Sequence, residues 1–498
     1  MVKMSDDLDI LLINVGGTKK LVYQDLTKTF SAVDPPFWAA LTAGFLRNKD
    51  FRVDILDAGG LNLDEREIAN IVKKRNPRFV GVVVYGQQAN TCAPIMIGVR
   101  KVCREIKKQD PKRNIIVSGW HPSALPKRTL EEEKCDFVVK GEGFYTYLDL
   151  LNGKEFEQIP GLWWKENGGI LNNPKPKNIE DLSKELNDVA WDLLPMKKGI
   201  YRCFNWLALN DMKTRNRCAS ILTSLGCPYK CSFCAIHATF GERRIRYWST
   251  EWVLDQFDTL VKEYGVKHVN FNDELFVFNP KHYLPIAEGL IERKYDLNMC
   301  AFARVDSIKK EHLPILKKAG FNWFKLGIES GNTDILKRAS KGRFNKDDVR
   351  KVVKETKEVG ISLCANFIFG LPGETFETMQ DSLNLALELN AEFPSFFAAM
   401  APPGSDLYFN AKKENIPLPD DKDGPGWIGF AQQGYEFLPL PTEKLTASEV
   451  LAFRDYAFDT YFRNPRYLNE MEERFGKEAR EHLEAMAEIR LKRKLLGD

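Results

Sequence analysis

Two long stretches of this sequence alternate short apolar runs with helix-like segments, which limits the possible folds more than any other feature. The five runs of the first stretch lack strict apolar–polar alternation and lie at 9–15, 52–58, 79–85, 114–120 and 136–142. The segments between them carry apolar residues at the i, i+3, i+4 spacing of helices. Strands buried on both sides and separated by helices predict a parallel, doubly wound α/β sheet. Such sheets bind ligands at the carboxyl ends of their strands.

The second stretch begins near residue 217 and contains six further strand-like runs in about 190 residues. Six β/α units predict a barrel or partial (β/α)6 barrel, with its chemistry at the carboxyl ends of the strands. Between the two stretches, WWKENGGILNNPKPKNIEDL predicts a small hairpin and a linker, and the last 90 residues are mostly helical. The predicted division is a Rossmann-like domain at 1–150, a linker at 151–215, a barrel at 216–405 and a helical domain at 406–498.

Composition restricts the partners and the location. The chain has 498 residues, of which 44% are apolar, enough to build several cores. Its 72 basic and 69 acidic side chains nearly balance, so no nucleic acid and no anionic membrane is required as a partner. The first residues lack the basic and apolar regions of a signal peptide, and the longest apolar runs have strand length. These features predict a cytoplasmic protein with no membrane partner.

Three cysteines lie close together in TSLGCPYKCSFCAIH, immediately after the first predicted barrel strand. Cys227, Cys231 and Cys234 have the spacing C-x3-C-x2-C. A disulfide uses two thiols, and a structural zinc site usually has four ligands. A 4Fe–4S cluster held by three thiolates keeps one iron open to an outside ligand. The other seven cysteines are dispersed and are read as buried free thiols.

This cysteine spacing after a first barrel strand, with Phe233 before the last cysteine, resembles the radical S-adenosylmethionine (SAM) superfamily. The resemblance implies that the open iron chelates SAM and that an electron from the cluster cleaves it to methionine and a 5'-deoxyadenosyl radical. A zinc site is the alternative for the three cysteines.

The resemblance also implies SAM contacts at the later strand ends. Acidic residues after the second strand would meet the SAM amino group, and an arginine after the third would meet its carboxylate. GIESG and NFIFGLPGE would contact ribose and adenine. The residues matched in this way are Phe233, Asp273, Glu274, Arg304, Glu329, Ser330, Asn366, Ile368 and Gly370. A capped strand end or a turn is the alternative at each position.

The first domain lacks the G-x-G-x-x-G spacing of dinucleotide-binding domains. Its YGQQANT, SGWHPSALP and VVKGEGFYT segments, with DPPFWAALTAGFLR and VDILDAGG, resemble the cobalamin-binding domain that precedes many radical SAM barrels. The matched residues are Tyr85, Gly86, Gln87, Gln88, Asn90, Ser118, Gly119, Trp120, His121, Gly141, Glu142 and Gly143. A flavodoxin-like docking module is the alternative for the domain.

The D-x-H-x-x-G motif that supplies a histidine to cobalt in another cobalamin class is absent. We therefore expect no histidine on cobalt and expect its lower face to lie against the loop from Tyr85 to Asn90. For His121, a loop histidine bonded to the backbone is the alternative.

The resemblance covers nearly the whole chain and implies a cobalamin-dependent methyltransferase that acts on an unactivated sp3 carbon. One SAM would be the radical source, and a second would be the methyl donor through methylcobalamin. A flavodoxin or ferredoxin would supply electrons. Two alternatives stay open: a cyclase, ring-contracting or hydroxylating enzyme with the same cofactors, and a cobalamin-responsive sensor or docking protein without catalysis.

The substrate is the least determined partner, and both a small molecule and a protein side chain agree with the sequence. Segments after the barrel are expected to close the cavity, with Trp427, Tyr435 and Tyr456 as candidate lining residues. Ordinary aromatic core packing is the alternative for these three side chains.

Overall fold

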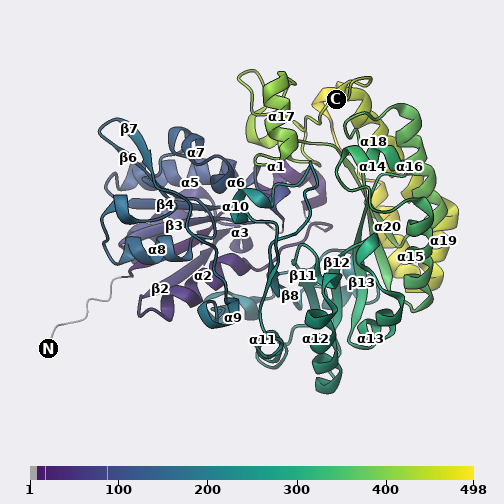
Figure 1. Ribbon diagram of the computed structural model, residues 1–498, viewed down its shortest axis with the longest axis horizontal. Coiled ribbons are helices and arrows are strands. Elements are labelled where there is room, and N and C mark those ends of the chain that lie inside the picture. Colours follow the sequence, from purple (N-terminus) through teal and green to yellow (C-terminus); the bar gives the residue numbers. More distant parts are fainter. Residues whose placement is uncertain (1–7, 17, 28, 87) are drawn as a thin grey trace.

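The computed structural model describes residues 8–498 except residues 17, 28 and 87. Two large sheets, each with its own helices, lie side by side (Figure 1). The first sheet is formed by the amino-terminal part of the chain, and the second is formed by its central part. The predicted fold class is confirmed: a Rossmann-like α/β domain precedes a six-stranded β/α barrel and a mainly helical carboxyl-terminal region.

The first sheet has the strand order β2-β1-β3-β4-β5-β6-β7. Neighbouring strands are parallel from β2 to β5, whereas the β6–β7 hairpin is antiparallel and extends the β5 edge. The strands are β1 (Ile10–Asn14), β2 (Val53–Asp57), β3 (Phe79–Val84), β4 (Asn114–Gly119), β5 (Phe137–Val139), β6 (Leu162–Glu166) and β7 (Gly169–Asn172). The predicted hairpin therefore belongs to the first sheet, while the boundary at residue 150 stays a prediction.

Helices cover both faces of this sheet, as buried central strands require. Every residue of β3, FVGVVV, is buried. Helices α2 and α8 pack together on one face, and α4 and α5 pack together on the other. Asp64 and Glu67 form a capping box at the start of α4, which satisfies backbone N–H groups there. The main helices are α2 (Phe37–Arg47), α4 (Glu65–Arg75), α5 (Ile95–Gln109), α6 (Trp120–Ala124), α7 (Pro126–Glu132) and α8 (Phe144–Leu151).

The second sheet has the order β15-β14-β13-β12-β11-β8, and all its neighbours are parallel. Its strands are β8 (Cys218–Ile221), β11 (His268–Phe271), β12 (Asn298–Arg304), β13 (Phe321–Glu329), β14 (Ser362–Phe369) and β15 (Phe393–Ala398). The helices between them are α11 (Thr250–Lys262), α12 (Pro280–Arg293), α13 (Leu313–Lys318), α14 (Thr333–Arg338), α15 (Lys346–Glu358) and α16 (Phe376–Leu389). This arrangement is the predicted partial (β/α)6 barrel.

A short segment closes the amino end of the barrel. Its 3-10 helix η6 (Trp206–Ala208) places Trp206 against Trp323 of β13, with ring centroids 5.1 Å apart. Asn298, the first residue of β12, donates to the Leu207 carbonyl at 2.6 Å. Access to the barrel is therefore from the carboxyl ends of its strands.

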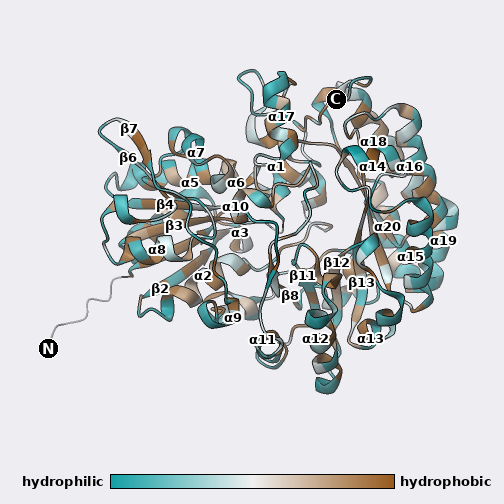
Figure 2. Ribbon diagram, viewed as in Figure 1, coloured by the Kyte–Doolittle hydropathy of each residue, from teal (hydrophilic) through white to brown (hydrophobic). Residues whose placement is uncertain are grey.

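The carboxyl-terminal region packs on the β15 edge. Helix α18 contacts β15 and α20, and Arg454 of α18 donates to the Phe396 carbonyl at 2.9 Å. Its helices are α17 (Asp406–Glu414), α18 (Ala447–Phe462), α19 (Pro465–Phe475) and α20 (Lys477–Ala487). Figure 2 shows hydrophobic residues on the strands and hydrophilic residues on outward helices such as α12 and α19. Among the described residues, no helix combines the length and the apolar character needed to cross a membrane.

Candidate active site

The three clustered cysteines lie on a loop after β8 and the short strand β9 (Ser224–Leu225), at the carboxyl end of the barrel. Cys227, Cys231 and Cys234 are half-buried free thiols, and the Cys234 N–H donates to the Cys231 carbonyl at 3.0 Å. Burial raises the pKa of Cys227 to about 12, so a metal must displace its proton on binding.

The three thiols lie on one loop, as the expected cluster requires. Within the described ranges, no three His, Cys, Asp or Glu side chains converge closely enough to hold one metal ion. A 4Fe–4S cluster binds each thiolate to a different iron, so its ligands surround a volume and do not converge on one point. The loop therefore supplies the three thiols that the expected cluster needs, and the assignment of the cluster to these cysteines stays a prediction.

Cationic side chains surround the cysteine loop. Arg304, at the end of β12, places its Nη1 3.7 Å from the Cys231 Sγ and its guanidinium 3.8 Å from the centre of the Tyr229 ring. Arg343 lies over the same ring at 5.3 Å. Arg304 also forms a bidentate ion pair with Asp306. If Arg304 binds the SAM carboxylate as predicted, its guanidinium must bind that carboxylate and Asp306 at the same time.

The two acidic residues after β11 occupy different environments. Asp273 is fully buried and accepts hydrogen bonds from the Thr223 backbone, the Thr223 hydroxyl and Ser224 Oγ at 3.1, 2.8 and 2.5 Å. Glu274 lines a cavity, and burial together with the neighbouring Asp273 raises its pKa to about 7. Asp273 therefore holds the end of β8, while Glu274 can meet a ligand.

Glu329, the last residue of β13, has a positive φ of 67° and forms an ion pair with Lys341. Both side chains are buried. The Lys341 Nζ also lies 5.9 Å from the centre of the Phe233 ring, which joins the predicted ribose segment to the cysteine loop. No pattern in the sequence links Lys341 to Glu329, because the two residues are separated by helix α14.

Glu374 connects the two remaining segments that are predicted to contact SAM. Its carboxylate accepts the N–H groups of Gly370 and Leu371 at 2.6 and 2.9 Å, and the Ser330 hydroxyl lies 3.4 Å away. Burial raises the pKa of Glu374 to about 8. Ile368 packs against a small core that also contacts Phe233, and Asn366 is half-buried on β14.

Aromatic residues gather at the carboxyl end of the first sheet. Tyr85 stacks on Trp38 at 4.3 Å, and Trp120 meets the Tyr85 ring edge-on at 5.1 Å. Phe240, which follows the cysteine loop, lies 5.3 Å from Trp120. Trp38 and Phe240 were not selected from the sequence, although Trp38 lies in the DPPFW segment that supported the resemblance.

These rings line a cavity of about 260 Å³ that is partly open to solvent. Glu274 and Asn272 line it from the barrel, whereas Trp38, Tyr85 and Trp120 line it from the first sheet. The Tyr85 hydroxyl and the Trp120 Nε1 are buried and find no hydrogen-bond partner among the described residues. A wide apolar surface with two unpaired polar atoms fits the expected cobalamin.

The other residues matched to cobalamin are glycines and loop residues, or side chains that already have protein partners. Gly86 lines the cavity, and the Gln88 carbonyl accepts from Thr91 Oγ1 at 2.9 Å; Gln87 lies outside the described residues. Gly119 has a φ of 130°, and a Cβ there would lie 2.1 Å from the Val84 carbonyl oxygen, so a side chain would clash. Gly141 and Gly143 also have positive φ.

Several of these side chains already have protein partners. Ser118 accepts from the Tyr147 hydroxyl at 2.8 Å. Glu142 pairs with Arg246 of the barrel-side hairpin strand β10 (Arg246–Tyr247) and accepts the Ile179 N–H at 2.9 Å. Asn90 accepts the N–H of Ala235, next to Cys234, at 3.0 Å. Glu142 and Asn90 thus join the two domains.

His121 does not line the cavity; it is buried, with its ring centre 4.4 Å from that of Trp427. Burial and the nearby Arg128 lower its pKa to about 3, so the imidazole is neutral. The absence of a histidine on cobalt stays a prediction. The three candidate substrate residues also lie outside the cavity lining: Trp427 packs under Arg128, Tyr435 donates to the Asp498 carbonyl, and Tyr456 is 54% exposed.

Two sequence families match this chain: the Radical SAM superfamily over residues 221–386 and the B12 binding domain over residues 23–151. An uncharacterized methyltransferase of Pyrococcus horikoshii is 30% identical over 398 residues, which are 79% of this chain and 82% of the relative. An anaerobic magnesium-protoporphyrin IX monomethyl ester cyclase of Rubrivivax gelatinosus is 26% identical over 389 residues, 75% of this chain and 66% of the relative.

A solved structure has the same fold. It is the radical S-adenosylmethionine methyltransferase TsrM from Kitasatospora setae with cobalamin and a 4Fe–4S cluster bound. The TM-score is 0.68 at 17% identity, and the superposition covers 92% of this chain and 89% of that chain.

Proposed function

Because this chain belongs to the family of cobalamin-dependent radical SAM methyltransferases, we propose that it methylates an unactivated sp3 carbon. Its cofactors are a 4Fe–4S cluster, SAM and cobalamin. The observation that carries the proposal is the shared cavity, because Glu274 of the barrel and Trp38, Tyr85 and Trp120 of the first domain line the same space. A substrate held there would lie between the two cofactor sites.

The chain's own residues would bind, orient and shield the reactants. When bound, the cluster supplies the electron that cleaves one SAM, and cobalamin carries the methyl group of a second SAM. Glu274 would hold the SAM ammonium, since its carboxyl faces the cavity and a nearby positive charge favours the ionised form. The apolar faces of Trp38 and Trp120 would exclude water from the site.

We propose that electrons enter beside Tyr229, from a flavodoxin or ferredoxin. Lys230 and Arg343 are exposed there, and Phe278, which is 39% exposed, meets the Tyr229 ring edge-on at 6.1 Å. Tyr229 also contacts Arg304, which approaches Cys231. An acidic donor would therefore find a basic and aromatic surface close to the cluster ligands.

A second function with the same cofactors is oxidative cyclisation, which the likeness to the magnesium-protoporphyrin cyclase favours. Both reactions would use SAM cleavage, so detecting 5'-deoxyadenosine does not separate them. They differ in the fate of the methyl group, because only methyl transfer converts a second SAM to S-adenosylhomocysteine.

The test uses reconstituted enzyme, a candidate small-molecule substrate and SAM with a trideuterated methyl group. We expect the product to gain all three deuterons after the first turnover, with 5'-deoxyadenosine and S-adenosylhomocysteine formed in near-equal amounts. A product without the label, formed without stoichiometric S-adenosylhomocysteine, would replace methylation with cyclisation or another oxidative outcome.

A further inference from the structure

The six residues that follow the last cluster cysteine, Ala235 to Phe240, reach from the barrel to the first domain; we call them the bridge segment. Its last four residues form helix α10 (His237–Phe240), which packs on α6 of the first domain. The first residue of the bridge segment directly follows Cys234, and Ile236 and Phe240 line the shared cavity. The bridge segment therefore contacts both predicted cofactor sites.

The far end of the bridge segment is held firmly. Phe240 packs edge-on against Trp120 with ring centroids 5.3 Å apart. The Phe240 carbonyl accepts hydrogen bonds from Lys175 and from the Asn178 side chain, the second at 2.8 Å. These contacts tie Phe240 to the first domain and to the segment after its hairpin.

At the near end, a side chain of the first domain binds the backbone next to Cys234, and His237 Nε2 of the bridge segment also bonds to the Tyr229 carbonyl at 2.6 Å. The Ala235 N–H donates to the Asn90 Oδ1 at 3.0 Å. Asn90 belongs to the 3-10 helix η2 (Ala89–Thr91), in the loop that begins with the cavity-lining Tyr85. Bonds within that loop fix its shape: Gly86 N–H donates to Cys92 Sγ at 3.2 Å, and Thr91 N–H donates to the Gln88 carbonyl at 3.1 Å. Asn90 therefore connects a braced loop of one site directly to the ligand loop of the other.

We propose that Asn90 is a positioning residue that sets the distance between the cluster and cobalamin and thereby couples the two uses of SAM. A shift of Asn90 moves the Tyr85 loop relative to Cys234, because the hydrogen bond joins backbone next to Cys234 to that loop. The proposal about the distance requires only that the cluster and cobalamin are both bound. The claim of coupling rests on the proposed methyl transfer.

Asn90→Ala removes the acceptor, and Asn90→Asp keeps an oxygen at the same position. The control is Asn173→Ala, which removes side-chain bonds to the Phe156 and Ile159 carbonyls at the hairpin of the first sheet, remote from the cysteine loop. Each variant is reconstituted with iron, sulfide and cobalamin. Pulsed electron paramagnetic resonance then measures the dipolar distance between the reduced cluster and cob(II)alamin without any substrate.

We expect Asn90→Ala to lengthen or broaden the distance distribution, while Asn90→Asp and Asn173→Ala keep that of the native chain. With substrate, the ratio of 5'-deoxyadenosine to S-adenosylhomocysteine should rise about fivefold in Asn90→Ala, equivalent to about 1 kcal/mol for one hydrogen bond. Asn90→Asp should keep the native ratio.

An unchanged distance distribution in Asn90→Ala would overturn the proposal, as would an equal change in Asn173→Ala. If Asn90→Ala does not retain cobalamin, Asn90→Gln takes its place under the same criteria, since its amide is displaced by one methylene. The distance measurement does not depend on the reaction. Loss of the labelled methyl group from the product would therefore refute the proposed function and leave the distance result standing.

Discussion

At the scale of single residues, burial decides which predicted side chains can meet a cofactor. Asp273 and Glu274 are neighbours in the chain. The Asp273 carboxylate accepts hydrogen bonds from Thr223 and Ser224, whereas Glu274 faces the cavity. His121 and Trp120 are also neighbours, and only Trp120 lines the cavity. Glu374 shows the opposite case, because this buried carboxyl braces two SAM segments without a predicted role.

Glu374 should make the stability of the protein depend on pH. Burial raises its pKa from 4.5 to about 8, so the folded chain binds more protons than the unfolded chain between these values. The free energy of unfolding must then fall as pH rises through that window. Glu374→Gln keeps an acceptor for Gly370 and Leu371 but cannot ionise, so it should reduce the fall by up to about 5 kcal/mol.

Urea denaturation of the cofactor-free chain at several pH values checks this result. Asp273 and Glu274, with pKa values raised to about 6 and about 7, contribute slopes of the same sign to both proteins. Slopes of the opposite sign come in both proteins from the histidines whose pKa values burial lowers to about 3 or about 4, which are His121, His268, His282 and His482. The difference between the two proteins therefore reports Glu374. Equal slopes for the native chain and Glu374→Gln would show that Glu374 is ionised in both the folded and the unfolded chain throughout this pH window.

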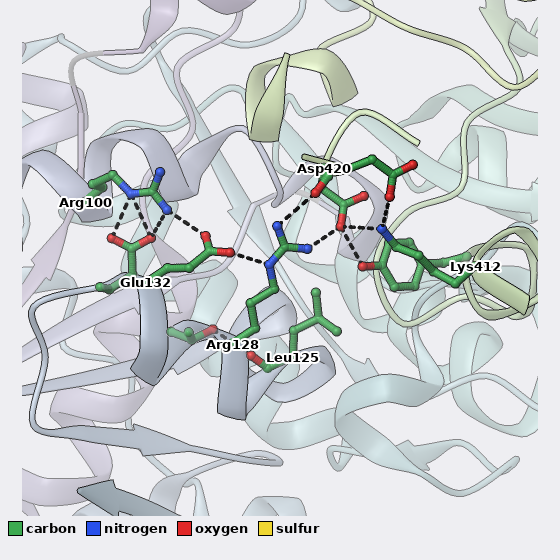
Figure 3. Close-up of polar contacts among 10 residues, drawn as sticks. Arg100, Leu125, Arg128, Glu132, Lys412 and Asp420 are labelled. Atoms are coloured by element: carbon green, nitrogen blue, oxygen red, sulfur yellow. Dashed lines mark hydrogen bonds and ion pairs between the residues drawn. The ribbon is translucent and has the colours of Figure 1, made fainter. Parts of the chain in front are cut away.

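At the scale of elements, charged side chains fasten the carboxyl-terminal region to the first domain. Figure 3 shows Arg128 of α7 between Glu132 of the same helix and Asp420, which follows α17. Asp420 also accepts from the Tyr408 hydroxyl at 2.7 Å and pairs with Lys412 at 3.2 Å. Its carboxylate is fully buried, so each partner offsets the cost of removing that charge from water.

Arg128→Met should therefore destabilise the protein by about 3 kcal/mol, since it leaves a buried carboxylate with fewer partners. A matched control is Arg350→Met, whose pairs with Asp347 and Glu388 are exposed and screened by water, so its loss of stability should be much smaller. Chemical denaturation measures both changes, and adding Asp420→Asn to Arg128→Met should restore part of the loss. Similar losses for the two single variants would contradict the assigned role of the buried ion pair.

At the scale of the whole molecule, the two cofactor sites come from separate sheets that meet at one cavity. The cysteine loop follows β8 of the barrel, whereas Tyr85 and Trp120 follow β3 and β4 of the first sheet. Each site can therefore lose its cofactor without dismantling the sheet of the other.

Replacing Cys227, Cys231 and Cys234 together by Ala should abolish iron binding and SAM cleavage and leave cobalamin binding intact. The reconstituted native chain should hold about four irons, and the variant none. Iron analysis and the visible absorption of bound cobalamin measure the two contents on one sample. Iron retained with full SAM cleavage would remove the cluster from these cysteines, and loss of cobalamin would show that the sites are interdependent.

Local patterns in the sequence were sufficient for the fold class, the order of the strands along the chain and the cysteine loop. Runs such as FVGVVV indicate a strand that is buried on both sides, and the three cysteines of the loop lie within eight consecutive residues. Strand-end position also predicts where ligands bind, because parallel strands carry their loops to one edge.

Only the tertiary structure decided which side chains face the cavity and which join the domains. Lys341 meets Glu329, Arg246 meets Glu142 and Asn90 meets Ala235 across long sequence separations, and no local pattern encodes such pairs. Trp38 becomes a neighbour of Trp120 only when the first domain folds, and Phe240 does so only when the barrel packs against that domain. The physical reason is that propensity and periodicity act over one element, whereas burial and pairing depend on how the elements pack.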